Sequence, residues 1–297
     1  MLLIPRFLVV CMTSSCAVCR RVSAAIVIQL LAAASGMAAP RQVSAPHLTV
    51  ELLADQATIV PGKDLWLGIR FALEPGWHIY WQNPGDSGGP PTVGWKLPAG
   101  LAAGPIEWPA PERIEVPPLV NYGYDGDVVL PVRISAANRQ LAGDVRLAAT
   151  VKWLVCRDLC LSGRADVELP LPLPPELTGA VPGWKKLLSQ ALGKVPRAAP
   201  ASWKAEARSE GDNFVVSVQT GRREAGGVFF PLDEDQIDDS APQKVEPFAE
   251  GVRFTLRKSN RLLTAPAALR GVISLPGARA FVVSAPLDAK VSQRRTR

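Results

Sequence analysis

The sequence has 297 residues, of which 47% are hydrophobic and 20% charged, with a formal net charge of +6 at pH 7. This balance is typical of a globular protein, and the length suggests one large or two ordinary domains. The excess of basic over acidic residues comes from the two ends of the chain, and no stripe of basic residues is interleaved with aromatic side chains, so we expect no nucleic-acid binding. The basic residues near the ends are Arg6, Arg20, Arg21, Lys290, Arg294, Arg295 and Arg297.

Residues 1–39 are predicted to be an export signal. Arg20 and Arg21 precede an apolar run over 22–34, and small residues follow, as they do at a signal cleavage site. Residues 1–19 are also apolar and long for a leader, so a later translation start and a retained anchor are the alternatives. Cleavage leaves 30 basic against 27 acidic residues, a net charge of +3. We expect a periplasmic protein.

Cleavage would leave the chain with two cysteines. Cys11, Cys16 and Cys19 lie in the predicted signal, and Cys156 and Cys160 lie beyond it. An exported protein is in an oxidising compartment, where a disulfide can form and persist.

Alternating hydrophobic residues predict a β-rich domain over 46–173. Strands are expected around 48–52, 65–73 and 128–134, because apolar residues recur there at every second position. Proline and glycine pairs between these runs, including 83–85, predict turns. The pattern favours a β-sandwich, and a barrel would give a similar pattern.

The stretch 145–171 predicts a β-hairpin that carries both cysteines. Alternation runs up to Val155 and resumes after Gly163. A three-residue loop over 157–159 would place Cys156 and Cys160 opposite each other, with Cβ atoms about 4.5–5.5 Å apart, close to what a disulfide needs. By parity, both sulfurs are expected to lie away from the main core.

The second half predicts a smaller β-sandwich. Residues 174–200 are expected to be a linker with a short helix over 184–192, because apolar residues fall on one face there. Alternation returns over 201–287, and 288–297 is a basic tail. The acidic run 233–239 lacks the glycine spacing of a calcium loop, so we expect a solvated loop.

The usual enzyme motifs are missing from the sequence. The two histidines, His47 and His78, show no metal-ligand spacing, and there is no nucleophile elbow or phosphate-binding loop. We expect no cofactor and no metal site. The segment 120–126, in which glycines adjoin tyrosines, is predicted to be a mobile loop with apolar tips.

Several motifs resemble the N-terminal periplasmic domain of DsbD-type thiol:disulfide interchange proteins. The similarity is strongest to their copper-tolerance branch (suppressor of copper sensitivity), and it extends over most of residues 46–285. The segments that carry it lie at 76–88 (GWHIYWQNPGDSG), 95–100, 106–113, 120–124, 153–160 (WLVCRDLC), 229–231 and 241–243.

The resemblance implies an immunoglobulin-like β-sandwich whose two cysteines cycle between dithiol and disulfide. Cys160 would attack the client and Cys156 would resolve the mixed disulfide. The residues that match the family's shielding cap are Val120, Asn121, Tyr122 and Tyr124. From the sequence itself, Lys152 and Arg157 should favour a thiolate, and Asp158 should oppose it.

The resemblance also implies partners. Family members continue into a membrane domain and a thioredoxin-like domain, whereas this sequence ends at Arg297. We therefore expect a membrane-embedded electron donor on a separate chain, and exported thioredoxin-fold proteins as clients. The chain would then be one component of a protein-disulfide reductase. Two alternatives are that the thiol pair binds Cu(I), for which thiolates are good ligands, and that the disulfide is static in an interaction domain.

Overall fold

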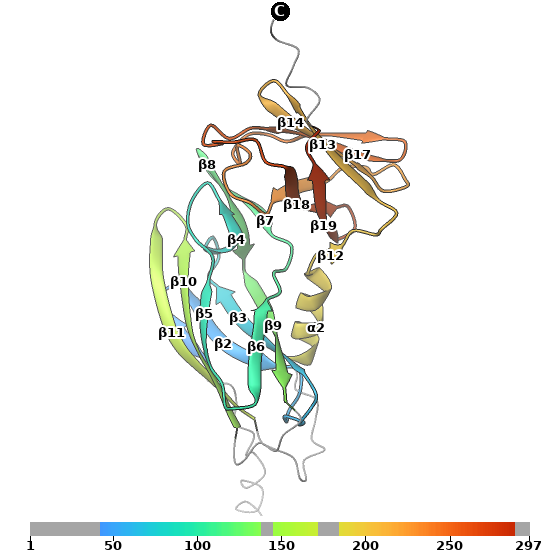
Figure 1. Ribbon diagram of the computed structural model, residues 1–297. Coiled ribbons are helices and arrows are strands. Elements are labelled where there is room, and N and C mark those ends of the chain that lie inside the picture. Colours follow the sequence, from blue (N-terminus) through green and yellow to red (C-terminus); the bar gives the residue numbers. More distant parts are fainter. Residues whose placement is uncertain (1–41, 138–144, 172–183, 289–297) are drawn as a thin grey trace, which may run out of the picture. The chain divides into compact units, whose positions relative to one another are not determined.

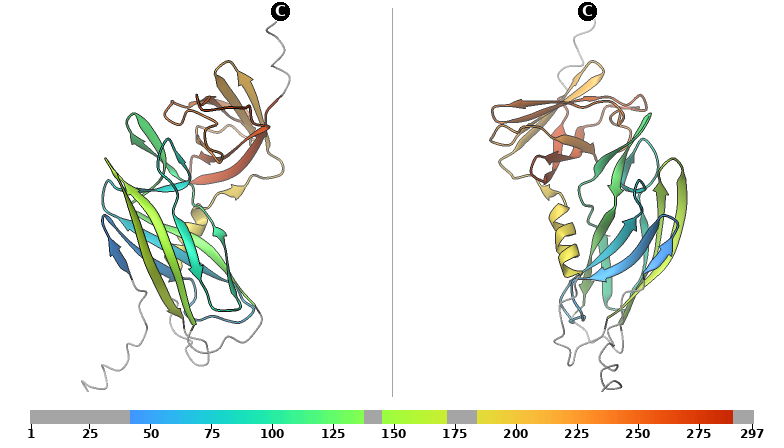
Figure 2. Two further views of the ribbon diagram at one scale, coloured as in Figure 1. Left: turned by 60° about the vertical axis from the view of Figure 1, so that its left-hand side comes forward. Right: turned by 180° about the vertical axis from the view of Figure 1, so that it is seen from behind.

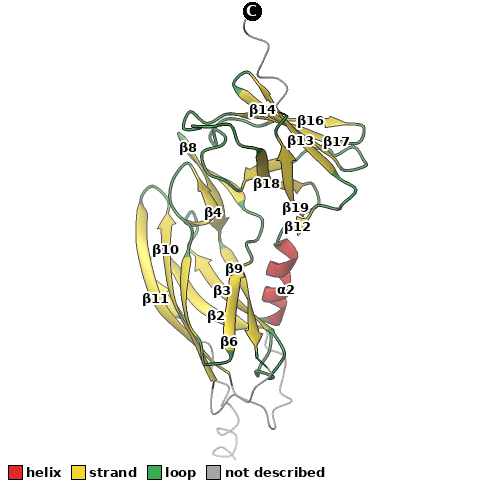
Figure 3. Cartoon of the chain, in the orientation of Figure 1, coloured by secondary structure: helices red, strands yellow, loops and turns green. Residues whose placement is uncertain are grey.

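The computed structural model describes residues 42–137, 145–171 and 184–288, and nearly all of their regular structure is β-strand (Figure 3). These residues belong to one compact unit that spans 40–297. The predicted signal 1–39 and most of the basic tail lie outside the described residues. Within the part that is described, no helix is long and apolar enough to cross a membrane.

The first β region has two sheets, whose strands can be followed in Figures 1 and 2. One sheet has the order β1-β2-β3-β9-β6, and the other has the order β11-β10-β4-β8-β7, with β5 also paired to β10. The strands of the first sheet are β1 (Val43–Ala45), β2 (Leu48–Ala54), β3 (Leu65–Leu73), β9 (Asp127–Ala136) and β6 (Leu101–Ile106). Those of the second are β11 (Cys160–Leu171), β10 (Val145–Cys156), β4 (His78–Gly85), β8 (Leu119–Asp125), β7 (Glu112–Val116) and β5 (Thr92–Lys96).

A hydrophobic core lies between these sheets. Along β10 the odd-numbered residues from Val145 to Val155 are buried, because successive side chains of a strand point to opposite faces. They pack in one cluster with the buried residues of β2, β3 and β9. The even-numbered residues of β10 therefore face away from this core.

The single described helix, α2 (Lys185–Lys194), packs on the first region. Leu188 and Ala191 are buried against Leu53 and Val129, which confirms the predicted helix and its apolar face. The amide of Ala110 donates a hydrogen bond to the carbonyl of Lys194 (2.9 Å) at the end of the helix.

The second β region has two four-stranded sheets, in the orders β12-β19-β18-β15 and β13-β14-β17-β16. It has its own core, which includes Phe214, Phe229 and Phe254. The next residue, Phe230, points the other way and joins the core of the first region. The strands are β12 (Arg197–Ala198), β13 (Lys204–Glu210), β14 (Asn213–Gln219), β15 (Val228–Pro231), β16 (Lys244–Phe248), β17 (Gly251–Arg257), β18 (Ala268–Leu275) and β19 (Arg279–Pro286).

The strands predicted from alternation are present, and the fold is all-β as expected. Three local predictions were wrong. The expected turn at 83–85 lies within β4, where the pairing with β8 shifts register between Tyr80 and Gly85. The expected mobile loop at 120–126 is mostly strand β8, paired on both sides. The acidic run 233–239 is a loop, but Asp239 within it is only 3% exposed.

Candidate functional site: a disulfide at the mouth of a hairpin

The site is built on the tip of the β10–β11 hairpin. The two strands pair without a break from Val145 opposite Leu171 to Cys156 opposite Cys160. The loop between the cysteines has three residues, and the amide of Arg157 donates a hydrogen bond to the carbonyl of Leu159 (3.1 Å). The cysteine Cα atoms are 4.2 Å apart, and the sulfurs form a disulfide. The predicted loop and the opposed cysteines are confirmed.

The two cysteines differ in their exposure to solvent. Cys156 is 2% exposed, whereas Cys160 is exposed. Cys156 does not belong to the main core, as its parity predicted. Cys156 is nevertheless buried, because it lies beside strand β4 on the outer face of the second sheet.

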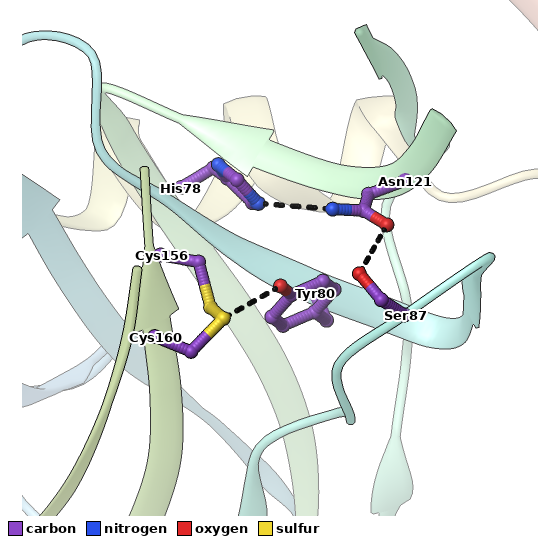
Figure 4. Close-up of a disulfide and its surroundings, with 6 residues drawn as sticks. All are labelled: His78, Tyr80, Ser87, Asn121, Cys156 and Cys160. Atoms are coloured by element: carbon purple, nitrogen blue, oxygen red, sulfur yellow. Dashed lines mark hydrogen bonds between the residues drawn. A yellow bond between two sulfur atoms is a disulfide. The ribbon is translucent and has the colours of Figure 1, made fainter. Parts of the chain in front are cut away.

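Strand β4 supplies the nearest cover. His78 lies opposite Cys156 in the pairing of β4 with β10, and it is 2% exposed. Tyr80 follows His78 by two residues and lies on the same face of β4. Its hydroxyl is 3.5 Å from Sγ of Cys160 (Figure 4). The two rings make an edge-to-face contact at 5.2 Å between centroids. Burial raises the pKa of Tyr80, so its hydroxyl keeps its proton at neutral pH and can donate to sulfur.

A polar network extends from His78 on the same face. The side-chain amide nitrogen of Asn121 lies 3.4 Å from Nε2 of His78, and the Ser87 hydroxyl donates to the Asn121 carbonyl oxygen at 2.9 Å (Figure 4). With this amide orientation Nε2 accepts the hydrogen bond, so a neutral His78 carries its proton on Nδ1. Burial lowers the pKa of His78, and the charge of Asp125 opposes that shift.

The loop after β4 lies over Tyr80. Gly88 has a φ of +90°, and a Cβ at this position would collide with the end of the Tyr80 ring. Only glycine combines this backbone conformation with so close an approach. Asp86 holds the start of the loop, because its carboxylate accepts the amide of Val120 (2.8 Å) and its own amide donates to the Val120 carbonyl (3.0 Å).

A stack of side chains supports the hairpin loop from the other direction. The Arg157 guanidinium lies over the Trp77 ring, 5.2 Å from its centroid, and donates to the carboxylate of Asp158 (2.8 Å). Trp77 also stacks on His47, with centroids 3.7 Å apart, and His47 Nδ1 lies 2.7 Å from the carboxylate of Glu74. These contacts fix the position of the Arg157 side chain at the hairpin loop.

The residues expected to form a cap lie mostly elsewhere. Val120, Tyr122 and Tyr124 are buried in β8, and the two tyrosine hydroxyls donate to Asp239 (2.8 Å) and to the Pro109 carbonyl (2.7 Å). Asn121 is the exception, since it contacts His78.

Of the expected modulating residues, Arg157 and Asp158 lie in the loop itself. Lys152 lies four residues back along β10, roughly 13 Å away at the rise of a strand. Its exposed side chain is therefore well separated from the sulfurs.

Sequence reasoning missed Tyr80, His78 and Ser87 as site residues. The signal was present in the quoted motif, because in W-H-I-Y-W the residues His78 and Tyr80 share one face of a strand. Within the described residues, no cluster of three or more histidine, cysteine or carboxylate side chains could hold a metal ion.

Residues 49–172 match the family described as thiol:disulfide interchange protein DsbD, N-terminal. This part of the chain is a DsbD-type N-terminal domain, as the sequence motifs indicated. No curated protein matches the chain.

The fold resembles a solved structure, the N-terminal periplasmic domain of ScsB from Proteus mirabilis. The identity is 17% and the TM-score 0.63, over 83% of this chain and 96% of that one. Two further structures have TM-scores too low to carry an argument. The yeast GGA1 GAE domain has 12% identity and a TM-score of 0.25, over 44% of this chain and 99% of that one. The periplasmic chaperone SfaE has 10% identity and a TM-score of 0.21, over 80% of this chain and 100% of that one.

Proposed function

We propose that this chain is a periplasmic thiol–disulfide exchange module that passes electrons to exported client proteins. The observation that carries the proposal is the asymmetry of the pair: Cys160 is an exposed residue at the hairpin mouth, and Cys156, directly across the strand pair, is 2% exposed. A partner protein can reach Cys160 while Cys156 stays protected. The family match of residues 49–172 supports the same chemistry.

The exchange would take place in two displacements. In the dithiol form, the Cys160 thiolate attacks one sulfur of a client disulfide, and the other client sulfur leaves as a thiolate. Cys156, once deprotonated, attacks Sγ of Cys160 and releases the second client sulfur. The client gains two electrons and, on protonation, two protons, while Cys156 and Cys160 become a disulfide. An electron donor with a dithiol reverses these steps and restores the reduced pair.

Two groups near the pair would favour the thiolate of Cys160. The Tyr80 hydroxyl lies within hydrogen-bond distance of its sulfur, and the Arg157 guanidinium is fixed beside the loop by Trp77. Positive charge and hydrogen-bond donors both stabilise a thiolate. Asp158 opposes this effect, because its carboxylate pairs with Arg157.

The finer parts of the proposal concern location and partners. Export rests on the signal predicted from the sequence of residues 1–39. A membrane-embedded donor, thioredoxin-fold clients and a role in copper tolerance extend from the family resemblance. The shielding role proposed for Val120–Tyr124 is better assigned to Tyr80 and the loop around Gly88, since these contact the disulfide or the side chain beside it.

The reduction potential of the cysteine pair tests the proposal directly. We expect a value between roughly −180 and −270 mV, the range of thiol-exchange proteins, when the protein is equilibrated in graded glutathione buffers. A value well below about −300 mV would mean a static structural disulfide and would overturn the proposal. If such a protein, once reduced, took up Cu(I) through its thiols, metal binding would be the better account.

Trapping separates the roles of the two cysteines. The Cys156→Ala variant should form a persistent mixed disulfide with a client through Cys160, because the resolving thiol is gone. The Cys160→Ala variant is the matched control and should trap at least about 100-fold less, because Cys156 is buried. Equal trapping by both variants would contradict the assigned roles.

A further inference from the structure

The hairpin loop displays a large apolar side chain next to the exposed cysteine. Leu159 is 57% exposed and directly precedes Cys160. Short loops of this kind usually carry polar or small residues. Among the described residues, large hydrophobic side chains are exposed at Leu119, Leu159, Leu263 and Val282, and of these only Leu159 adjoins a cysteine of the disulfide.

The charges beside Leu159 compensate each other. Arg157 donates to the carboxylate of Asp158 at 2.8 Å and lies over the Trp77 ring. The loop therefore presents an apolar side chain beside a paired cation and anion, with no excess of either sign. Such a surface gives little electrostatic attraction for a strongly acidic or strongly basic partner.

Covalent geometry brings any partner against this side chain. In a mixed disulfide the partner's Cα lies about 4.4–6.8 Å from that of Cys160, and the Cα of Leu159 is about 3.8 Å from the same atom. The partner residues next to the reacting cysteine therefore lie within reach of Leu159. Solvent that now surrounds its side chain would be displaced at the moment of exchange.

We propose that Leu159 is a specificity residue, which selects partners whose reacting cysteine lies in an apolar, uncharged surface. This inference rests on the exchange function proposed above and names the class of partner. Burying the exposed part of a leucine should favour an apolar over a polar partner by about 4- to 15-fold in rate, if the contact is made in the transition state.

The test uses two capped, uncharged peptides, each with one cysteine activated as a mixed disulfide with an aromatic thiol. One has leucine and valine beside the cysteine, and the other has serine and glutamine. In the first step the Cys160 thiolate bonds to the peptide sulfur and the coloured aryl thiolate leaves, so one disulfide breaks as another forms. The reduced Cys156→Ala protein isolates this step.

Three variants in that background give the comparison. The apolar peptide should react about 4- to 15-fold faster than the polar one with Leu159 in place. This preference should fall to within about twofold in Leu159→Ser and be retained in Leu159→Met. Leu263→Ser is the matched control, because it removes an equally large exposed side chain (95% exposed) elsewhere and should leave the preference unchanged.

The outcomes separate this inference from the function it rests on. If the protein reacts with both peptides at equal rates, or keeps its preference in Leu159→Ser, the role of Leu159 is overturned and the exchange function stands. If the reduced protein releases no aryl thiolate, even from a small aromatic disulfide, the exchange function fails and the inference falls with it. The preference should also change less than about twofold between low and high salt, since no net charge is engaged.

Discussion

The two β regions use buried polar side chains in different ways. In the first region, His78, Asn121 and Ser87 form a hydrogen-bonded chain on the outer face of a sheet, next to a disulfide in which Cys160 is exposed. In the second, Glu224 is 3% exposed and is enclosed by Arg279 and Arg222. The first arrangement lies beside the proposed exchange site. The second satisfies a buried carboxylate within the region.

Asp239 lies where the two regions meet. It belongs to a loop of the second region, and it accepts the hydroxyl of Tyr122 from β8 (2.8 Å). Burial raises its pKa to about 6, whereas the hydrogen bonds to Arg279 and the other partners lower that of Glu224 to about 2. These opposite shifts predict opposite responses of stability to pH.

The largest expected effect is on stability, from Glu224→Ala. Removing the carboxylate leaves the partly buried Arg279 without its partner, and we expect a loss of about 2–3 kcal/mol in the free energy of unfolding. The folded-state pKa of Glu224 lies below its usual value, so its contribution is present above about pH 4.5 and is lost as pH falls toward about 2. Urea unfolding of the wild type and the variant at pH 7 and at pH 3 measures both the loss of stability and its dependence on pH.

A matched control is Glu246→Ala in the same region. Its ion pair with Lys244 is exposed, so the expected loss is below about 1 kcal/mol. If the two variants lose equal stability at pH 7, the Glu224 cluster is not the buried ion pair described here.

The second prediction concerns Asp239→Asn. Because the folded-state pKa of Asp239 is raised, the folded protein binds the proton of this carboxyl group more tightly than the unfolded chain does. The contribution of Asp239 to stability is therefore greatest below about pH 4 and is lost as pH rises through about 6. Asparagine does not titrate and can still accept the Tyr122 hydroxyl. The free energy of unfolding of the variant should therefore rise by about 1–2 kcal/mol relative to that of the wild type between pH 4 and pH 7.

Glu234→Gln, at an exposed position of the same loop, is the control for Asp239→Asn. Parallel pH curves for the wild type and Asp239→Asn would contradict the assignment.

These two carboxyl groups also show what the sequence could predict. The strands with a clean period of two, such as those expected around 48–52 and 65–73, were predicted, as were the hairpin and its three-residue loop. Asp239 was placed in a solvated loop, because nothing in an acidic run shows which carboxylate a distant tyrosine will bury. Strands β4 and β8 were missed because aromatic and polar residues occupy their outer face, which hides the alternation, and because β4 shifts register before Gly85.

The site was predictable in its chemistry and not in its surroundings. The cysteines, their pairing and Arg157 follow from local sequence, because five neighbouring residues contain them all. Tyr80 reaches the disulfide, and Gly88 the Tyr80 ring, only through tertiary packing, and both lie more than 65 residues before the cysteines in the chain. The burial of Cys156 depends on that packing, and for this reason the asymmetry between the two cysteines could not be read from the hairpin alone.

The third prediction tests the contact from Tyr80. Tyr80→Phe keeps the ring and removes the hydroxyl that lies 3.5 Å from Sγ of Cys160. The rate at which iodoacetamide alkylates Cys160 at pH 7 should fall about 3- to 10-fold, since the thiolate loses a hydrogen-bond donor. Tyr124→Phe is the control, because its hydroxyl donates to the Pro109 carbonyl, and it should leave the alkylation rate unchanged. A faster rate in Tyr80→Phe would mean that the hydroxyl shields the sulfur more than it stabilises the thiolate.

The smallest expected effect, from Lys152→Ala, decides whether sequence proximity or geometry governs the site. Lys152 and Arg157 are both close to Cys156 in sequence, but Lys152 lies roughly 13 Å back along β10, beyond the screening length of about 8–10 Å at physiological salt. Lys152→Ala should therefore change the alkylation rate of Cys160 by less than about twofold. Arg157→Ala, which removes the charge that Trp77 holds at the loop, should slow it several-fold. If the two variants slow alkylation equally, the thiolate responds to the overall charge of the strand, and the stack on Trp77 has no special role.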